Sequence, residues 1–201
     1  LEPSNAGIEA GCQGTLVARL TSLGVRSHSA RSWKGVNAIH ALHEAINVLT
    51  AYKPRSVEID GLTYREGLNA VRIEGGTANN VMPDNVTMNV NYRYAPSRTA
   101  QEAEQHVRDV FSGYTVDIID NVAGAMPGLD RPALAELVKR VDRQVAPKFG
   151  WTDVARFYAM GVPAVNLGPG DPSLAHARNE HVSMAQLQQC EDTVFAWLLG
   201  K

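Results

Sequence analysis

The segment that most constrains the fold lies between residues 86 and 94. Here apolar side chains occupy every second position, and Thr87, Asn89, Asn91 and Arg93 occupy the positions between them. Side chains on a β-strand alternate between its two faces, so this pattern predicts a strand that is buried on one face and polar on the other.

Three more strands and two helices are predicted around this strand. The strands are 15–23, 68–73 and 114–119, and the helices are 36–49 and 99–111. The first helix would bury Ile39, Leu42, Ile46 and Leu49, and Pro54 forbids its continuation. Thr99 and Glu102 form a capping-box pattern at the start of the second helix. The order strand, helix, strand, strand, helix, strand predicts a ferredoxin-like (βαββαβ) sheet with both helices on one face.

After residues 121–128, a glycine-bearing linker, the pattern changes to alternating helices and strands. Pro132 opens a helix, 153–160 forms a second helix and 162–167 forms a buried strand. Ser183 and Gln186 give the capping-box pattern of a last helix. This part resembles half of an α/β layer, so the fold class is α/β overall.

A turn-rich loop from Gly168 to His181 presents His176 among acidic and basic neighbours. Glycine and proline prevent regular structure there, and loops of this kind often carry functional side chains. Histidine is a common zinc ligand, and Glu180 or Asp171 could orient its ring. A surface histidine in a polar turn is the alternative interpretation.

Five separated motifs together resemble one family, the dinuclear-zinc aminoacylase and carboxypeptidase superfamily. They are Leu1-Glu2-Pro3-Ser4-Asn5, Gly11-Cys12-Gln13-Gly14, Ala78-Asn79-Asn80-Val81-Met82-Pro83, Gly150-Trp151-Thr152-Asp153 and the His176 loop. Within this superfamily the motifs are most similar to those of succinyl-diaminopimelate desuccinylases. The resemblance implies hydrolysis of the amide bond of N-succinyl-LL-2,6-diaminopimelate. It also implies a homodimer through a lid domain, residues 14–120, inserted into a catalytic domain formed by residues 1–13 and 121–201.

The resemblance also implies a role for individual residues. Glu2 and His176 would each bind one of two zinc (or cobalt) ions, and His28 would enter the partner subunit's active site to stabilise the oxyanion. Substrate would be bound by Asn79, Asn80, Arg93 and Thr152. Each has a plainer alternative: a polar loop histidine, turn-forming asparagines, a solvated strand face for Arg93 and a helix cap for Thr152.

The family's His-x-Asp metal motif, its bridging aspartate and its Glu-Glu general base do not occur in this sequence. One expected ligand per metal is fewer than the three that a catalytic zinc site usually needs. We therefore expect a fragment that is inactive alone. The alternatives are a related amidohydrolase, such as an acetylornithine deacetylase or an aminoacylase, and a non-catalytic dimerisation or ligand-binding module.

Charge and composition exclude other classes of function. The 201 residues carry a formal net charge of -2 and no long basic run, which argues against nucleic-acid binding. No apolar run approaches the length of a membrane span. Cys12 and Cys190 are expected to be reduced thiols in a cytoplasmic protein. His106, next to acidic residues in the second predicted helix, is expected on a solvated face.

Overall fold

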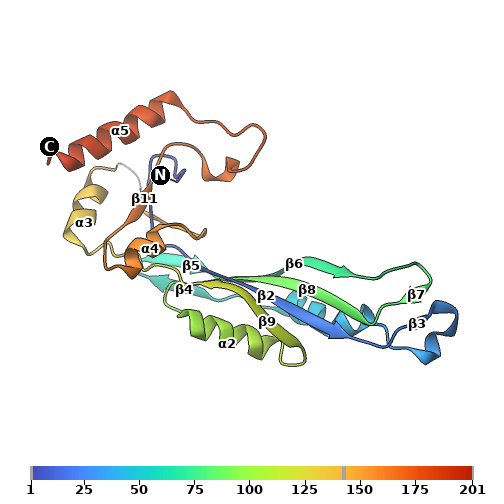
Figure 1. Cartoon of the computed structure of the whole chain (residues 1–201). Coiled ribbons are helices and arrows are strands. Elements are labelled where there is room, and N and C mark those ends of the chain that lie inside the picture. Colours follow the sequence, from blue (N-terminus) through green and yellow to red (C-terminus); the bar gives the residue numbers. More distant parts are fainter. Residues whose placement is uncertain (1, 142–143, 201) are drawn as a thin grey trace.

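The computed structural model describes residues 2–141 and 144–200. Figure 1 shows a long sheet with helices along it, and a smaller part at one end of this sheet that contains both termini. Residues from the beginning and from the end of the sequence therefore form the smaller part together.

The long sheet has four strands in the order β6-β8-β2-β9, and every neighbouring pair is antiparallel. The strands are β2 (Gly14–Leu23), β6 (Gly67–Gly75), β8 (Asn85–Tyr94) and β9 (Thr115–Val122). The predicted alternation in β8 is confirmed, because its apolar positions are buried and its polar positions are only partly covered or exposed.

Two helices, α1 (His43–Ala51) and α2 (Ala100–Val110), share one hydrophobic core with the sheet. The capping box of Thr99 and Glu102 is present at the start of α2. The predicted first helix is wrong in its start, since a 3-10 turn (η2, His40–Leu42) precedes α1, and in half of its buried face. Leu42 and Leu49 contact the core as predicted, but Ile39 is 49% exposed. Leu42 and Ala45 are buried, whereas Ile46 is 42% exposed, because it lies one residue, about 100°, round the helix from Ala45.

Short elements that the sequence analysis did not predict complete this part. They are the hairpin β4 (Ser56–Ile59) and β5 (Leu62–Arg65), the pair β3 (Ser27–His28) and β7 (Val81–Met82), and the 3-10 helix η1 (Ser29–Lys34). Asp60 and Gly61 form the two-residue turn of the hairpin with φ of 52° and 75°. An Asp-Gly pair between alternating strands is a strong hairpin signal, so this element was readable from the sequence.

The smaller part is built on a three-stranded sheet in the order β10-β1-β11. Its elements are β1 (Ile8–Ala10), β10 (Ala146–Pro147), β11 (Val165–Leu167), α3 (Pro132–Lys139), α4 (Val154–Ala159), η3 (Pro172–Leu174) and α5 (Met184–Leu198). The capping box predicted for α5 is wrong, because Ser183 makes no side-chain cap. The Gln186 side chain instead accepts a hydrogen bond of 2.9 Å from the Gly170 N–H and holds the loop.

Candidate functional site

The segment that carries Glu2 is tied to the loop that follows β11. The Ser4 N–H donates to the Gly168 carbonyl at 3.2 Å, and the Asn5 N–H donates to the Gly170 carbonyl at 2.8 Å. The Gly168 N–H donates in turn to the Ser4 hydroxyl at 2.9 Å. A Cβ on Gly168 would lie 2.3 Å from the Glu2 carbonyl, so only glycine permits this close approach. Glu2 therefore sits at the start of the loop that contains His176.

A pocket of about 450 Å³ opens at this junction, and Glu2, Asp171, Glu180 and His181 contribute to its lining. His176 is exposed, has a φ of 66° and donates its backbone N–H to the Glu180 carboxylate at 3.1 Å. Among the described residues, no three His, Cys, Asp or Glu side chains are grouped so that they could hold a metal ion. The possible metal ligands within the described residues therefore do not complete a zinc site.

Thr152 lies in a neighbouring pocket of about 320 Å³ that Glu2 also lines. The residue is 6% exposed, and its hydroxyl has no hydrogen-bond partner among the residues that the structure describes. It does not cap α4, whose N-cap residue is Asp153. A buried hydroxyl without a partner is costly, so this one is available to a bound molecule.

His28, Asn79 and Asn80 meet at the opposite end of the long sheet. β3 pairs with β7 there, and the Ser29 N–H donates to the Asn80 carbonyl at 2.9 Å. Nδ1 of His28 accepts the Ala30 N–H at 3.1 Å, and the residue is exposed. Figure 1 shows β3 and β7 at the end of the sheet that is farthest from the termini. The structure thus brings these three residues together but keeps them apart from Glu2.

Arg93 lies near the other end of β8, on the face of the sheet that neither helix covers. It stands opposite Gly67 of β6 and Thr15 of β2. Its Nε donates to the Asn91 side chain at 3.1 Å, which orients the guanidinium. Arg93 is therefore close to the smaller part of the molecule, in contrast to His28.

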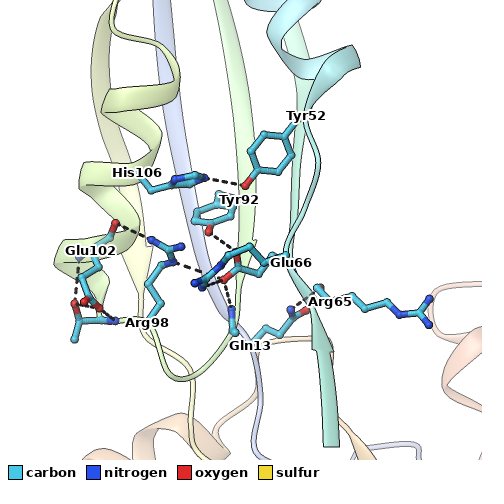
Figure 2. A network of polar contacts seen from close by, with 11 residues as sticks. Gln13, Tyr52, Arg65, Glu66, Tyr92, Arg98, Glu102 and His106 are labelled. Atoms are coloured by element: carbon cyan, nitrogen blue, oxygen red, sulfur yellow. Dashed lines mark hydrogen bonds and ion pairs between the residues drawn. The ribbon is translucent and has the colours of Figure 1, made fainter. Parts of the chain in front are cut away.

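A buried carboxylate that the sequence analysis missed lies on the other face of the same sheet end. Glu66 has no exposed side-chain surface and accepts hydrogen bonds from Arg55 at 2.7 and 3.0 Å, the Tyr92 hydroxyl at 2.9 Å and the Ala95 N–H at 3.1 Å. Arg98 adds an ion pair at 3.6 Å. Figure 2 shows Tyr92 and Arg98 approaching Glu66 from different elements. Burial alone would raise the pKa of Glu66, but the donors outweigh it and hold the pKa below 4.5.

His106 belongs to this network, and its expected place on a solvated face is wrong. Its Nε2 lies 2.8 Å from the Tyr52 hydroxyl, and its ring centroid lies 5.1 Å from that of Tyr92, with the two rings tilted by 38°. Burial first, and then the positive charge of Arg98, lowers the pKa of His106 below 6.5. His106 lies one turn beyond Glu102, but the fold turns it toward α1 and β8 (Figure 2).

Residues 11–117 match the M20 peptidase dimerisation domain, which is more than half of the chain. The chain belongs to this family. The match covers three strands of the long sheet, the first three residues of β9, both helices and the β4–β5 hairpin.

Two relatives are similar over almost the whole chain. A Mycobacterium tuberculosis protein with the provisional name succinyl-diaminopimelate desuccinylase DapE is 53% identical over 99% of this chain and 57% of its own length. The succinyl-diaminopimelate desuccinylase of Corynebacterium glutamicum is 50% identical over 92% of this chain and 52% of its own length. This chain thus spans little more than half the length of these relatives.

Solved structures of more distant proteins share the fold. A Staphylococcus aureus tripeptidase superposes with a TM-score of 0.74 at 18% identity, over 98% of this chain and 54% of its own. An M20 family metallo-carboxypeptidase of Sulfolobus solfataricus gives a TM-score of 0.71 at 15% identity, over 96% and 59%. At such identities the likeness concerns the fold alone.

Proposed function

We propose that this chain is part of a metal-dependent amidohydrolase that cleaves N-succinyl-LL-2,6-diaminopimelate into succinate and LL-2,6-diaminopimelate. The observation that carries the proposal is the identity of 50 to 53%, over almost the whole chain, to relatives named for this activity. The five motifs that suggested the activity lie in the chain in the expected order. Metallopeptidase relatives favour a metal cofactor.

The proposed metal centre holds two zinc or cobalt ions, with Glu2 on one ion and His176 on the other. The close approach of the Glu2 segment to the loop after β11 supports this pairing. A catalytic zinc usually needs three protein ligands, and no such group occurs within the described residues. The remaining ligands and the general base would come from protein sequence outside this chain.

His28 is proposed to act in the active site of a partner subunit, in a homodimer that pairs through the lid. β2 has ten residues, so the tip with β3 lies about 30 Å from the smaller part at 3.4 Å per residue. His28 therefore cannot reach the Glu2 pocket of its own chain. The edge strand β6 exposes Val71 and Ile73, at 60% and 52%, which suits pairing with a second copy.

The proposed substrate contacts use side-chain groups that can still bind a ligand. The Thr152 hydroxyl would bind substrate beside Glu2, and the Arg93 guanidinium would bind a substrate carboxylate. Asn79 and Asn80 would accompany His28 into the partner's site, because the three residues share one tip.

We also propose a ferredoxin-like fold for the lid and a division of the chain into two domains. The strand order β6-β8-β2-β9, with α1 and α2 in one core, supports a ferredoxin-like lid. The proposed division places this lid at residues 14–120 and the partial catalytic domain at residues 1–13 and 121–201.

Buried Cys12 and Cys190, both free, favour a cytoplasmic location. Across the described residues, no helix is long and apolar enough to cross a bilayer.

The test is hydrolysis of N-succinyl-LL-2,6-diaminopimelate with added zinc. This 201-residue chain is compared with a protein that also carries the upstream segment with the His-x-Asp and Glu-Glu motifs. Activity is expected only in the longer protein. Activity of the chain alone would contradict the proposed missing ligands, and inactivity of both would point to another acylated amino acid. Sedimentation of the chain measures the proposed dimer, which a monomer at micromolar concentration would contradict.

A further inference from the structure

We propose that Arg65 is a second carboxylate-binding arginine, which forms with Arg93 a paired-guanidinium site for the two carboxylates of one small molecule. This inference rests on the proposed function and extends it, since neither the motifs nor the relatives' names assign a role to Arg65.

The register of the sheet places both arginines on one face. Arg93 stands opposite Gly67, and Arg65, the last residue of β5, precedes Gly67 by two residues. Burial alternates without a break from residue 62 to residue 68, with the even positions buried, so Arg65 is a diagonal neighbour of Arg93 on the face that the helices leave uncovered. Diagonal neighbours in a sheet lie roughly 7 to 8 Å apart, within reach of long side chains. Gly67 carries no side chain between them, and a Cβ there would meet only the Asn69 side chain, at 3.7 Å.

The peptide unit that follows Arg65 is held by hydrogen bonds at its carbonyl and at its N–H. The Gln13 side chain, 2% exposed, donates to the Arg65 carbonyl at 2.7 Å, and the Glu66 N–H donates to the Arg55 carbonyl at 2.9 Å. Glu66 points into the buried network, so its neighbour Arg65 must point to the opposite face. Figure 2 shows the Arg65 side chain extending away from the Glu66 carboxylate. The backbone thus sets the face to which Arg65 points before any ligand binds.

Neither guanidinium is neutralised within the described residues. Ion pairs to a carboxylate are found for several other arginines of the long sheet's part, among them Arg26, Arg55 and Arg108, but not for Arg65 or Arg93. Arg93 spends its Nε on the Asn91 amide, which leaves the two terminal nitrogens for a ligand. Two unpaired guanidinium groups at one place create a local positive potential that favours an anion.

The two arginines border an open pocket of about 560 Å³ with Gln13, Thr63, Gly67 and Phe149. Phe149 is 49% exposed and comes from the smaller part, three residues before Thr152. The pocket therefore joins the uncovered face of the long sheet to the segment that carries Thr152. A planar guanidinium binds a carboxylate through two parallel hydrogen bonds, which lysine cannot reproduce.

The first test is calorimetric binding of glutarate and its monoamide, glutaramate, to this chain at low ionic strength. The wild-type chain is expected to prefer glutarate. Arg65→Gln should weaken glutarate binding about tenfold and remove most of the preference, since charged hydrogen bonds contribute on this scale. Arg65→Lys should restore only part of it. Arg19→Gln, on the same face but farther along β2, should change nothing. A wild-type chain without the preference, or an Arg65→Gln chain that keeps it, would overturn the proposal.

The second test separates this inference from the proposed function. In the longer protein, kcat/KM is compared for N-succinyl-LL-2,6-diaminopimelate and for Nα-succinyl-L-lysine, which lacks the distal carboxylate. Arg65→Gln should lower the ratio of the two values about tenfold and leave the lysine derivative unaffected. If the wild type hydrolyses neither compound, the proposed function fails, and glutarate binding still decides the role of Arg65. If it hydrolyses the first compound and the ratio survives the substitution, only the Arg65 inference fails.

Discussion

Replacement of Glu66 by glutamine should destabilise the chain strongly, because a buried charge network loses its central anion. Arg55, Tyr92 and the Ala95 N–H donate to this carboxylate, and Arg98 is ion-paired to it. The glutamine side chain keeps one acceptor oxygen, but its NH2 group replaces the other oxygen. This NH2 group is itself a donor and faces the donors that the carboxylate oxygen accepted. Arg98, with a side chain 15% exposed, would lose its only carboxylate partner among the described residues.

The expected loss in free energy of unfolding is about 3 kcal/mol. Removing one partner of a buried ion pair costs roughly 3–5 kcal/mol. The lower end applies here because the Arg55 side chain is 50% exposed and can be hydrated after the change. Urea unfolding at pH 7, followed by circular dichroism, measures the difference.

Glu74→Gln is the matched control, since it makes the same substitution in an exposed ion pair of β6. The side chains of Arg72 and Glu74 are 62% and 58% exposed, so the control should change stability by less than about 0.5 kcal/mol. Glu66→Gln within 1 kcal/mol of the wild type would refute the reasoning, because the network would then contribute no more than a surface pair.

The same pair of proteins should differ in their response to acid. The pKa of Glu66 is lowered below 4.5 in the folded state, so its ionised form stabilises the fold above that pH. This contribution is lost as the pH falls through the folded-state pKa. The stability gap between wild type and Glu66→Gln should therefore narrow below pH 4.5 and stay constant between pH 6 and 8.

Three further predictions concern other parts of the chain. Thr152→Val should leave the urea midpoint unchanged or raise it, because the Thr152 hydroxyl has no hydrogen-bond partner among the described residues. The same substitution should lower kcat/KM of the longer protein; a clear loss of stability would contradict this prediction. In an NMR titration, His106 should have a pKa below 6.5. The contribution of its neutral form to the free energy of unfolding is therefore present above pH 6.5 and is lost as the pH falls through the folded-state pKa; a titration midpoint above 6.5 would exclude the burial of His106 against Tyr52. Gly11→Ala should lower the free energy of unfolding by at least 2 kcal/mol more than Gly61→Ala. Both glycines have a positive φ, but only at Gly11 would a new Cβ lie within about 2.6 Å of backbone and side-chain atoms; equal urea midpoints of the two variants would disprove this.

The principal strands and the second helix were predictable because their patterns are local. The alternation of residues 86–94 and the capping box of Thr99 and Glu102 need no information from distant segments. The Asp60-Gly61 hairpin was also readable, but its strands are only four residues long and the helical and strand periods are hard to distinguish at that length. The face of α1 was predicted only in part: Leu42 and Leu49 contact the core, but Ile46 is apolar and yet exposed.

Residue types and motif order alone pointed to the candidate side chains, and the structure decided which of them lie together. Glu2 meets the loop after β11 only because Gly168 lets two distant segments touch. His28 is held about 30 Å away because the ten residues of β2 are fully extended.

What the sequence by itself determined is the family pattern, the strand and helix order and the identity of the candidate residues. What only the tertiary structure decided is the neighbourhood of each side chain, such as Arg65 beside Arg93 or Glu66 inside a network of donors. The physical reason is that a strand's two faces are distinguishable in the sequence, whereas its partners and register depend on contacts between segments far apart in the chain.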